Sequence, residues 1–237
     1  MYKVAVMQPY IFPYIGYWQL IRAVDEFVLL DDVNYIVRGY INRNTILLNG
    51  QPYRFTIPIK KASQNRLIMH TKLDFTQKEK DRFLLTIYTA YHKAKSYDLV
   101  MPLIEAIINN SQDDLTEFIR YSINIIDDYL HINTKISISS EVDKDLGVKA
   151  QDRIIEICKR KKADIYINPC GGRKLYEKEM FARENIKLLF LDPDLDSINY
   201  FQNQDTFQKS LSIIDILMFN TKDKITEFLG RYKLSEN

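Results

Sequence analysis

The sequence predicts an α/β fold: a mostly parallel, Rossmann-like sheet with helices on both faces, plus a β-hairpin and an all-helical insertion. Two observations support this prediction. Strand and helix patterns alternate along the chain. In addition, a strand, a short loop, a helix and a second strand follow one another within about thirty residues, and such βαβ units are almost always right-handed and parallel.

The first unit occupies the start of the chain. Lys3–Gln8 is a short apolar run that ends at Pro9, which indicates a buried strand. Gly16–Glu26 has apolar residues at helical spacing, and Phe27–Leu30 is a second apolar strand.

A β-hairpin and a helical stretch follow. Thr45–Leu48 and Tyr53–Pro58 flank Asn49-Gly50, a pair that accepts positive φ, so they indicate a hairpin. Residues 76–131 show apolar stripes typical of helices, and we treat this stretch as a candidate helical subdomain within a single domain spanning 1–237.

The remaining elements alternate again. We expect strands at Lys135–Ser139, Ile165–Asn168 and, as the last strand, Lys187–Leu191. We expect helices at Val148–Lys161, after the loop 169–173, near 207–219 and at 224–232.

Composition narrows the function classes. The chain has 237 residues, with 46% hydrophobic and 27% charged residues, which is ordinary globular composition. Its 33 Lys+Arg and 31 Asp+Glu give a net charge of +2 with no run of five or six like charges, so neither nucleic-acid binding nor recruitment to a membrane by a polybasic patch is expected. No apolar stretch is long enough for a membrane span, and Cys158 and Cys170 match no metal or disulfide spacing, so we expect a cytoplasmic protein.

Ligands of open α/β sheets bind beyond the carboxyl ends of the strands. The most unusual segment there is the loop Pro9–Ile15, which two prolines stiffen. We expect it to position a substrate through Gln8, the rings of Tyr10, Phe12, Tyr14 and Tyr17, and Gly16 at the start of the helix. The alternative is an aromatic plug under the edge of the sheet.

Two charged segments follow the second strand. Asp31 and Asp32 are candidate catalytic acids or Mg²⁺ ligands, because hard divalent ions favour carboxylates; the alternative is a capped turn. The segment that holds Arg38, Asn42, Arg43 and Asn44 is a candidate pocket for phosphate or carboxylate, with ordinary surface pairing as the alternative.

The loop after the Ile165–Asn168 strand contains Gly171-Gly172 followed by Arg173, a candidate phosphate-binding nest or a plain turn. Cys170 beside it could be a nucleophile, but the sequence identifies no partner histidine.

These motifs in their order resemble the WbqC-like family, from about Lys3 to Asn220. The resemblance rests on an ordered set of positions, namely Gln8-Pro9, Phe12-Pro13-Tyr14, Gly16, Asp31-Asp32, Arg38-Gly39, Asn42-Arg43-Asn44, Gly171-Gly172, Tyr176, Tyr200, Gln202, Phe207 and Ser212–Asp215. Many members carry histidine where this chain has Met7. Genes of the family occur in clusters for O-antigen and related surface polysaccharides, and a glycine transfer onto sugar has been proposed for some members.

The resemblance implies an enzyme that transfers an aminoacyl (glycyl) or acyl group to a nucleotide-linked amino sugar, with a nucleotide and Mg²⁺ as candidate cofactors. One alternative is a nucleotidyltransferase or ATP-dependent ligase of the HIGH-motif type, because Tyr14-Ile15-Gly16-Tyr17 stands where such enzymes have His-x-Gly-His. Another is a non-catalytic sugar- or nucleotide-binding module. The sequence leaves the oligomeric state open.

Overall fold

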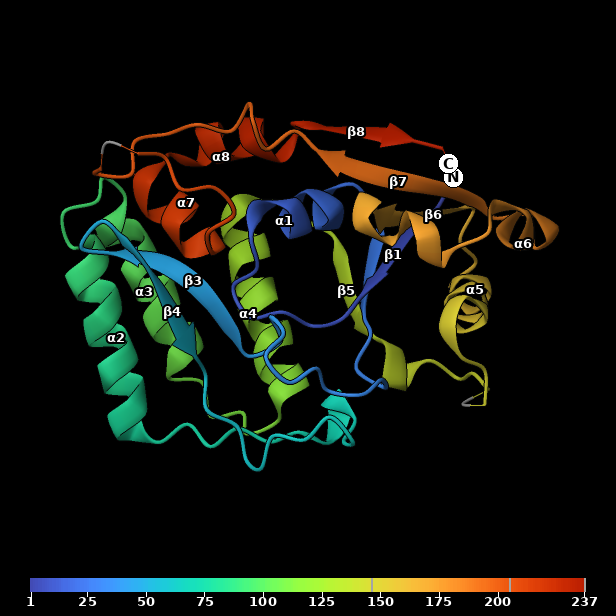
Figure 1. Cartoon of the computed structure of the whole chain (residues 1–237), viewed down its shortest axis with the longest axis horizontal. Helices are drawn as coiled ribbons and strands as arrows, with labels where there is room; N and C mark the ends of the chain where they lie inside the picture. Colours follow the sequence, from blue (N-terminus) through green and yellow to red (C-terminus); the bar gives the residue numbers. More distant parts are fainter. Residues whose placement is uncertain (146, 205, 237) are drawn as a thin grey trace.

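A six-stranded sheet forms the centre of the fold (Figure 1). The computed structural model describes residues 1–145, 147–204 and 206–236. The strand order is β5 (Lys135–Ile138), β2 (Glu26–Leu29), β1 (Lys3–Met7), β6 (Ile165–Pro169), β7 (Lys187–Pro193) and β8 (Tyr232–Ser235). The first five strands are parallel and β8 is antiparallel to β7, which confirms the predicted α/β class with a mostly parallel sheet. The prediction that Lys187–Leu191 is the last strand was wrong, because β8 follows it.

Both faces of the sheet are covered because successive strand residues point to opposite sides. Val4 and Val6 of β1 pack in one hydrophobic cluster together with residues of α5 (Ala150–Arg160) and α6 (Lys178–Arg183). Ala5 packs in a larger cluster on the other face. That cluster includes residues of α1 (Ile15–Arg22), α4 (Leu115–Leu130), α7 (Ile213–Phe219) and α8 (Lys222–Leu229).

The helical stretch contains three helices, α2 (Gln77–Tyr91), α3 (Tyr97–Ile108) and α4. They lie beside the sheet in Figure 1, and their apolar residues belong to the larger cluster rather than to a core of their own. In α2, Phe83, Ile87 and Tyr91 are buried, whereas Tyr88 is 49% exposed.

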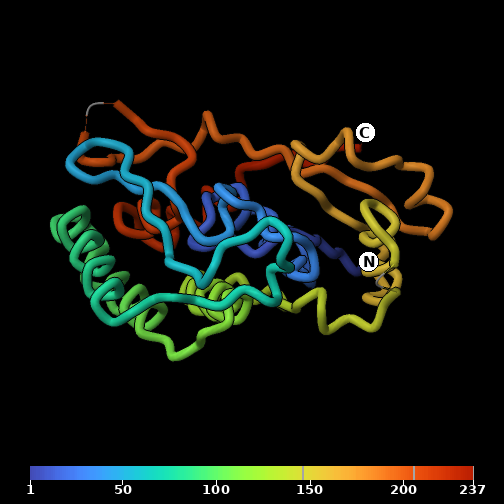
Figure 2. Tube along the Cα trace, turned by 60° about the horizontal axis from the view of Figure 1, so that its bottom comes forward, coloured from blue at the N-terminus to red at the C-terminus, as the bar shows by residue number. Residues whose placement is uncertain are grey.

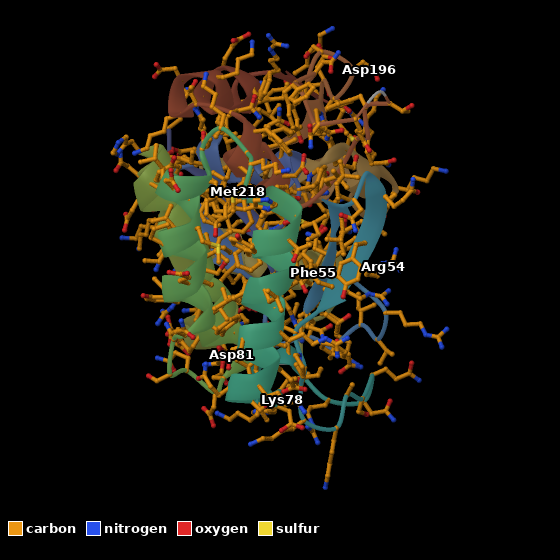
Figure 3. The ribbon with its side chains drawn as sticks, turned by 90° about the vertical axis from the view of Figure 1, so that its left-hand side faces the viewer. Arg54, Phe55, Lys78, Asp81, Asp196 and Met218 are labelled. Atoms are coloured by element: carbon orange, nitrogen blue, oxygen red, sulfur yellow. The ribbon has the colours of Figure 1, made fainter. Side chains whose placement is uncertain are left out.

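The predicted hairpin is confirmed as β3 (Arg43–Leu48) and β4 (Gln51–Thr56). Its turn residues Asn49 and Gly50 have φ of 52° and 71°, the left-handed conformation that an Asn-Gly turn adopts. Figure 3 shows Phe55 of β4 close to α2, and its ring lies 5.2 Å from that of Phe83. The hairpin therefore fastens the helical stretch to the rest of the fold.

Four local predictions differ from the structure. The expected helix Gly16–Glu26 is α1, which ends at Arg22, and Glu26 already belongs to β2. The expected loop 169–173 is instead the last residue of β6 followed by the start of a 3-10 helix, η3 (Cys170–Leu175). The expected helix near 207–219 begins only at Ile213, and the expected helix 224–232 runs from Lys222 to Leu229. Two further 3-10 turns, η1 (Ile68–His70) and η2 (Ser139–Glu141), follow the hairpin and β5.

Among the described helices, none has the length and apolar character needed to cross a membrane.

Candidate functional site

Side chains from distant segments hold the loop Pro9–Ile15 in place. The Phe12 carbonyl accepts hydrogen bonds from Asn44 Nδ2 and from Ser212 Oγ, each at 2.8 Å. Phe12 has φ of 43°, so its carbonyl points where an extended residue could not direct it. The Pro13 carbonyl accepts from Trp18 Nε1 at 3.2 Å. The loop is therefore a rigid part of the fold, and Asn44 acts on its backbone.

The aromatic side chains of this loop divide into two groups. Phe12 is fully buried, with its ring 6.3 Å from both Phe55 and Phe83, as expected for an aromatic plug. Tyr10 and Tyr14 are half-buried, and the Tyr10 ring lies 6.1 Å from that of exposed Tyr40. Of these four, Tyr10, Tyr14 and Tyr40 offer surface to a ligand and Phe12 does not.

The start of α1 is closed by its own aromatic residues. A Cβ on Gly16 would lie 2.5 Å from Tyr14 Cε2, so this glycine admits the Tyr14 ring rather than a ligand. Tyr17 is buried, and its hydroxyl donates to the Gln8 carbonyl at 2.9 Å. Of the two tyrosines that stand in place of the imidazoles of HIGH-motif enzymes, Tyr17 is therefore turned inward and Tyr14 is half-buried, and Gln8 contributes its backbone.

Most of the arginine- and asparagine-rich segment is engaged in holding loops together. Asn42 is buried, accepts from the Tyr35 hydroxyl at 2.5 Å and donates to the Ile57 carbonyl at 2.7 Å. Arg43 Nε donates to the Gly39 carbonyl at 2.8 Å. Arg38 is exposed, with φ of 67°.

The two adjacent glycines after β6 differ. A Cβ on Gly172 would lie 2.0 Å from Asn168 Nδ2, whereas one on Gly171 would meet open space. Arg173 donates to Asp192 Oδ2 at 2.6 Å, and its guanidinium lies 4.8 Å from the centre of the Phe190 ring. Gly172 is thus required by packing, and Arg173 ties η3 to β7.

Cys170 lies at the same end of the sheet. Burial and a hydrogen bond with Asp192 raise the pKa of its thiol. Since the thiolate is the reactive form, this environment disfavours Cys170 as a nucleophile.

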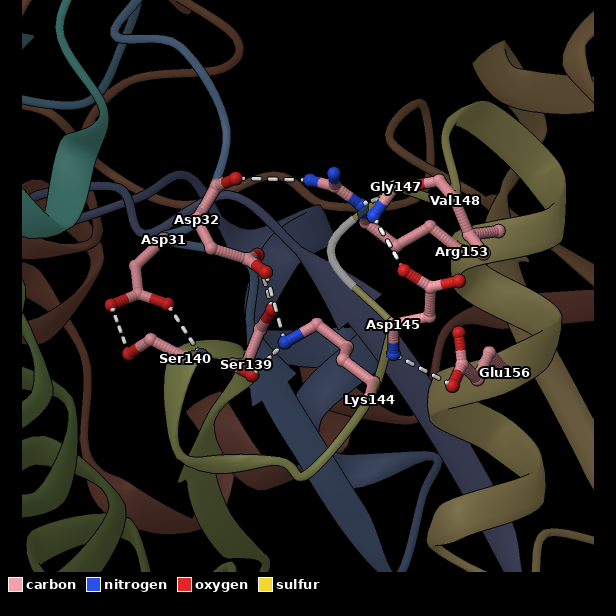
Figure 4. A network of polar contacts seen from close by, with 10 residues as sticks. All are labelled: Asp31, Asp32, Ser139, Ser140, Lys144, Asp145, Gly147, Val148, Arg153 and Glu156. Atoms are coloured by element: carbon pink, nitrogen blue, oxygen red, sulfur yellow. Dashed lines mark hydrogen bonds and ion pairs between the residues drawn. The ribbon is translucent and has the colours of Figure 1, made fainter.

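Asp31 and Asp32, at the end of β2, are both buried and point apart (Figure 4). Asp31 accepts from the Ser140 backbone N–H at 2.9 Å and from Ser140 Oγ at 2.8 Å. Asp32 accepts from Ser139 Oγ and forms an ion pair with Lys144 Nζ at 2.9 Å. The two acids therefore fasten the segment that follows β5 to the end of β2.

The pKa values of the two carboxyl groups are shifted in opposite directions. Burial raises the pKa of Asp31, although hydrogen bonds from Ser140 act against this. Burial would also raise the pKa of Asp32, but hydrogen bonds from Lys144 and Ser139 and the positive charge of Lys144 outweigh it and lower that pKa.

This arrangement does not fit a divalent cation at the acid pair. Lys144 already supplies the positive charge at Asp32, and the Asp31 oxygens accept from Ser140. Within the described ranges, no group of three or more His, Cys, Asp or Glu side chains is placed to bind a metal ion.

A cleft of about 600 Å³ opens at the carboxyl ends of the strands. It is lined by residues after β2, by the residue before η1, by the N-cap and first turns of α5, and by the end of η3 with its neighbour. These residues are Leu30, Asp32, Val33, Asn34, Leu67, Lys149, Ala150, Gln151, Arg153, Ile154, Leu175 and Tyr176. β1 lies between β2 and β6 in the sheet, so the cleft lies where the chain order reverses. Ligands of doubly wound sheets bind at this place.

The cleft has a cationic side and an apolar side. Lys149 is the N-cap residue of α5, and none of the described side chains caps the free N–H groups of this helix. Arg153 donates to the Asp32 carbonyl at 2.9 Å, so the acid pair and the start of α5 form one unit. Leu175 and the half-buried ring of Tyr176 line the cleft as well.

Of the predicted site residues, only Asp32 belongs to the part of this lining that the structure describes. Sequence reasoning did not single out Lys149 or Arg153, and it noted Tyr176 only through the family resemblance. The available signal was a pair of basic residues four apart at the start of a helix that follows a strand. Lys144, buried against Asp32, carries no such signal.

The fold and the cleft together define a doubly wound α/β protein with a cleft, cationic on one side and apolar on the other, at the switch point of its sheet. The chain belongs to the WbqC-like protein family, whose model matches residues 8–227. It is similar to the uncharacterized protein Rv1507c of Mycobacterium tuberculosis (strain ATCC 25618 / H37Rv), with 28% identity over 233 residues that cover 97% of this chain and 98% of that protein. No solved structure matches.

Proposed function

We propose that this protein binds a nucleotide-linked amino sugar in the carboxyl-edge cleft and transfers an acyl or aminoacyl group, such as glycyl, to it in surface-polysaccharide biosynthesis of the O-antigen type. Membership of the WbqC-like family supports the setting. The observation that carries the proposal is the cleft, whose side at the start of α5 is cationic.

The cleft suits a nucleotide-linked sugar in size and charge. Its volume of about 600 Å³ lies within the usual range for small-molecule sites. Lys149 and the uncapped first turn of α5 provide charge and N–H donors for a pyrophosphate. Ala150 has φ of 51°, and such strained residues concentrate at functional sites.

The rest of the lining suits the uncharged parts of the ligand. Tyr176 offers an aromatic face for a base or sugar ring, beside Leu175 and Leu67. Asn34 and Gln151 can form hydrogen bonds with sugar hydroxyls.

In the proposed reaction the amino nitrogen of the sugar attacks the carbonyl carbon of an activated acyl donor. A C–N bond forms and the bond from the carbonyl carbon to its leaving group breaks. The leaving group departs with the electron pair and takes the proton that the nitrogen loses, so an acyl thioester releases a thiol. In this scheme Asp31 and Asp32 transfer no proton, because their carboxylates already bind Ser140, Ser139 and Lys144. Their role is to hold the segment after β5 in place beside the cleft.

Calorimetric titration with a nucleotide-linked amino sugar, its free nucleoside diphosphate and the free amino sugar tests the binding. Lys149→Gln should weaken binding of both diphosphates by about tenfold or more, since it removes a charged hydrogen bond. Lys159→Gln removes the same charge from the same helix outside the cleft and should bind normally. Equal affinity of the two variants, or no binding of any diphosphate, would refute the site.

Mass spectrometry of the sugar after incubation with an acyl thioester tests the transfer. One observation favours a second candidate, a binding module without turnover: the carboxylates of both buried acids are engaged in structural contacts. Tight binding with no gain of acyl mass would select that candidate.

A further inference from the structure

The segment from Val33 to Leu73 contains seven Lys or Arg residues and no Asp or Glu. The rest of the chain therefore holds 26 of the 33 basic residues and all 31 acidic residues. This segment is therefore a basic region without acidic residues in an otherwise acidic chain, although it contains no run of five or six like charges.

The structure gathers part of this segment at one edge of the molecule. The Tyr35 N–H donates to the Arg66 carbonyl at 2.8 Å, and the Ile57 N–H donates to the Asn42 carbonyl at 2.7 Å. Residues 33–42 therefore run beside residues 57–68, in the lower part of Figure 1, where the later segment forms the edge of the molecule. Figure 2 shows this side turned toward the viewer. Val33, Asn34 and Leu67 of these two loops also line the cleft, so the basic edge adjoins its mouth.

The cations of this edge are exposed and unneutralised. Arg38, Lys60 and Lys61 are all exposed. Across residues 1–145, 147–204 and 206–236, no acidic side chain forms an ion pair with any of the three.

Apolar side chains project from the same edge. Ile36, Val37 and Tyr40 are 48%, 44% and 54% exposed, so three of the large exposed hydrophobic residues fall within five positions. Isolated exposed apolar residues are common on protein surfaces, whereas a cluster of them marks an interaction site.

We propose that this edge, formed by Ile36, Val37, Arg38, Tyr40, Lys60 and Lys61, docks on the surface of an anionic lipid bilayer. Adjacent aliphatic side chains at a loop tip can enter the region between headgroups and acyl chains while the flanking cations attract anionic lipids. Nucleic-acid grooves rely instead on stacked aromatic rings along a basic track. Docking would bring the mouth of the cleft close to the membrane surface, and it does not depend on the proposed function.

Flotation of the full-length protein with phosphatidylcholine vesicles, with or without phosphatidylglycerol, tests this proposal. The protein should float only with the anionic vesicles. Raising the ionic strength from about 0.1 M to about 1 M, which shortens the screening length from about 10 Å to about 3 Å, should release it.

Two paired variants identify the surface. Lys60→Gln/Lys61→Gln should weaken partition roughly thirtyfold, because each cation near an anionic bilayer contributes about fivefold. Lys93→Gln/Lys95→Gln removes the same charge from the exposed turn after α2 and should lose far less.

Ile36→Ser/Val37→Ser should also weaken partition, and Leu85→Ser/Leu99→Ser, at exposed positions on α2 and α3, should not. Unchanged unfolding midpoints would establish that all four variants fold. The proposal fails if the protein does not float, if each variant pair behaves like its control, or if an oligonucleotide rather than the anionic vesicles binds the protein.

Discussion

The ion pair between Lys144 and Asp32 gives the most specific prediction for the stability of the fold. The Lys144 side chain is 0% exposed, that of Asp32 is 4% exposed, and the pair is 2.9 Å apart. In Lys144→Met the Asp32 carboxylate would remain buried beside Ser139 without its cation. Removing one partner of a buried pair costs about 3–5 kcal/mol, and we expect about 3 kcal/mol because Ser139 still donates to Asp32.

Urea unfolding at pH 7 measures this loss, and a thermal scan should show a fall of about 6–12 °C in the unfolding midpoint for a chain of this size. The double variant Asp32→Asn/Lys144→Met removes both charges and should recover part of the loss. Lys149→Met, at an exposed position of the same segment, should stay within about 0.5 kcal/mol of the parent.

The pH dependence gives an independent check. The pKa of Asp32 is lowered in the folded protein, so its contribution to stability is present above the unfolded pKa and is lost as the pH falls through the folded pKa. The difference in free energy of unfolding between the parent and Lys144→Met should therefore become smaller at acidic pH. A Lys144→Met protein as stable as the parent at pH 7 would refute a structural role for this pair.

Three further predictions concern other buried positions. Hydrogen bonds from Lys161, Ser137 and Tyr2 outweigh burial and lower the pKa of Glu26 to about 2. Glu26→Gln should therefore lower the free energy of unfolding in urea by about 2–3 kcal/mol at pH 7 and by almost nothing near pH 2. Burial, with a smaller effect from the charge of Asp128, raises the pKa of Asp127 to about 6, so the Asp127 charge is destabilising above that pH. Asp127→Asn should therefore raise the free energy of unfolding by about 1–2 kcal/mol at pH 8 and leave it unchanged below pH 4, and the exposed neighbour variant Asp128→Asn should give a much smaller gain at pH 8. Gly172→Ala should lower the free energy of unfolding by about 1–3 kcal/mol, because the added methyl group clashes with Asn168. Gly171→Ala should leave it unchanged or raise it slightly. Equal unfolding free energies for the two variants would contradict the packing of Gly172 against Asn168.

The elements that the sequence predicted depend on local patterns. The apolar run before Pro9 and the Asn49-Gly50 turn are signals carried by neighbouring residues. The structure contains the elements that they predict, β1 and the β3–β4 hairpin. The edge strand β8 was missed because its four residues, Tyr232–Ser235, are half polar and gain their partner only from β7. A short strand of this kind has no signal apart from its neighbour.

The site was harder to predict because its contacts join distant residues. Whether Phe12 stacks on a ligand or fills the core depends on Phe55 and Phe83, which reach it through the hairpin and α2. Asp32 finds its partner Ser139 107 positions along the chain, so the sequence could not show that a second-strand acid holds the segment after β5. The two adjacent acids suggested catalysis or metal binding, whereas in the structure Asp32 forms an ion pair with Lys144.

A crystal structure of the protein with a nucleotide-linked amino sugar tests the central claim most directly. We expect the diphosphate at the first turn of α5 within hydrogen-bond distance of Lys149 Nζ, with a ring of the ligand against Tyr176. A ligand bound instead at the rings of Tyr10 and Tyr40, with the cleft filled by water alone, would contradict the account.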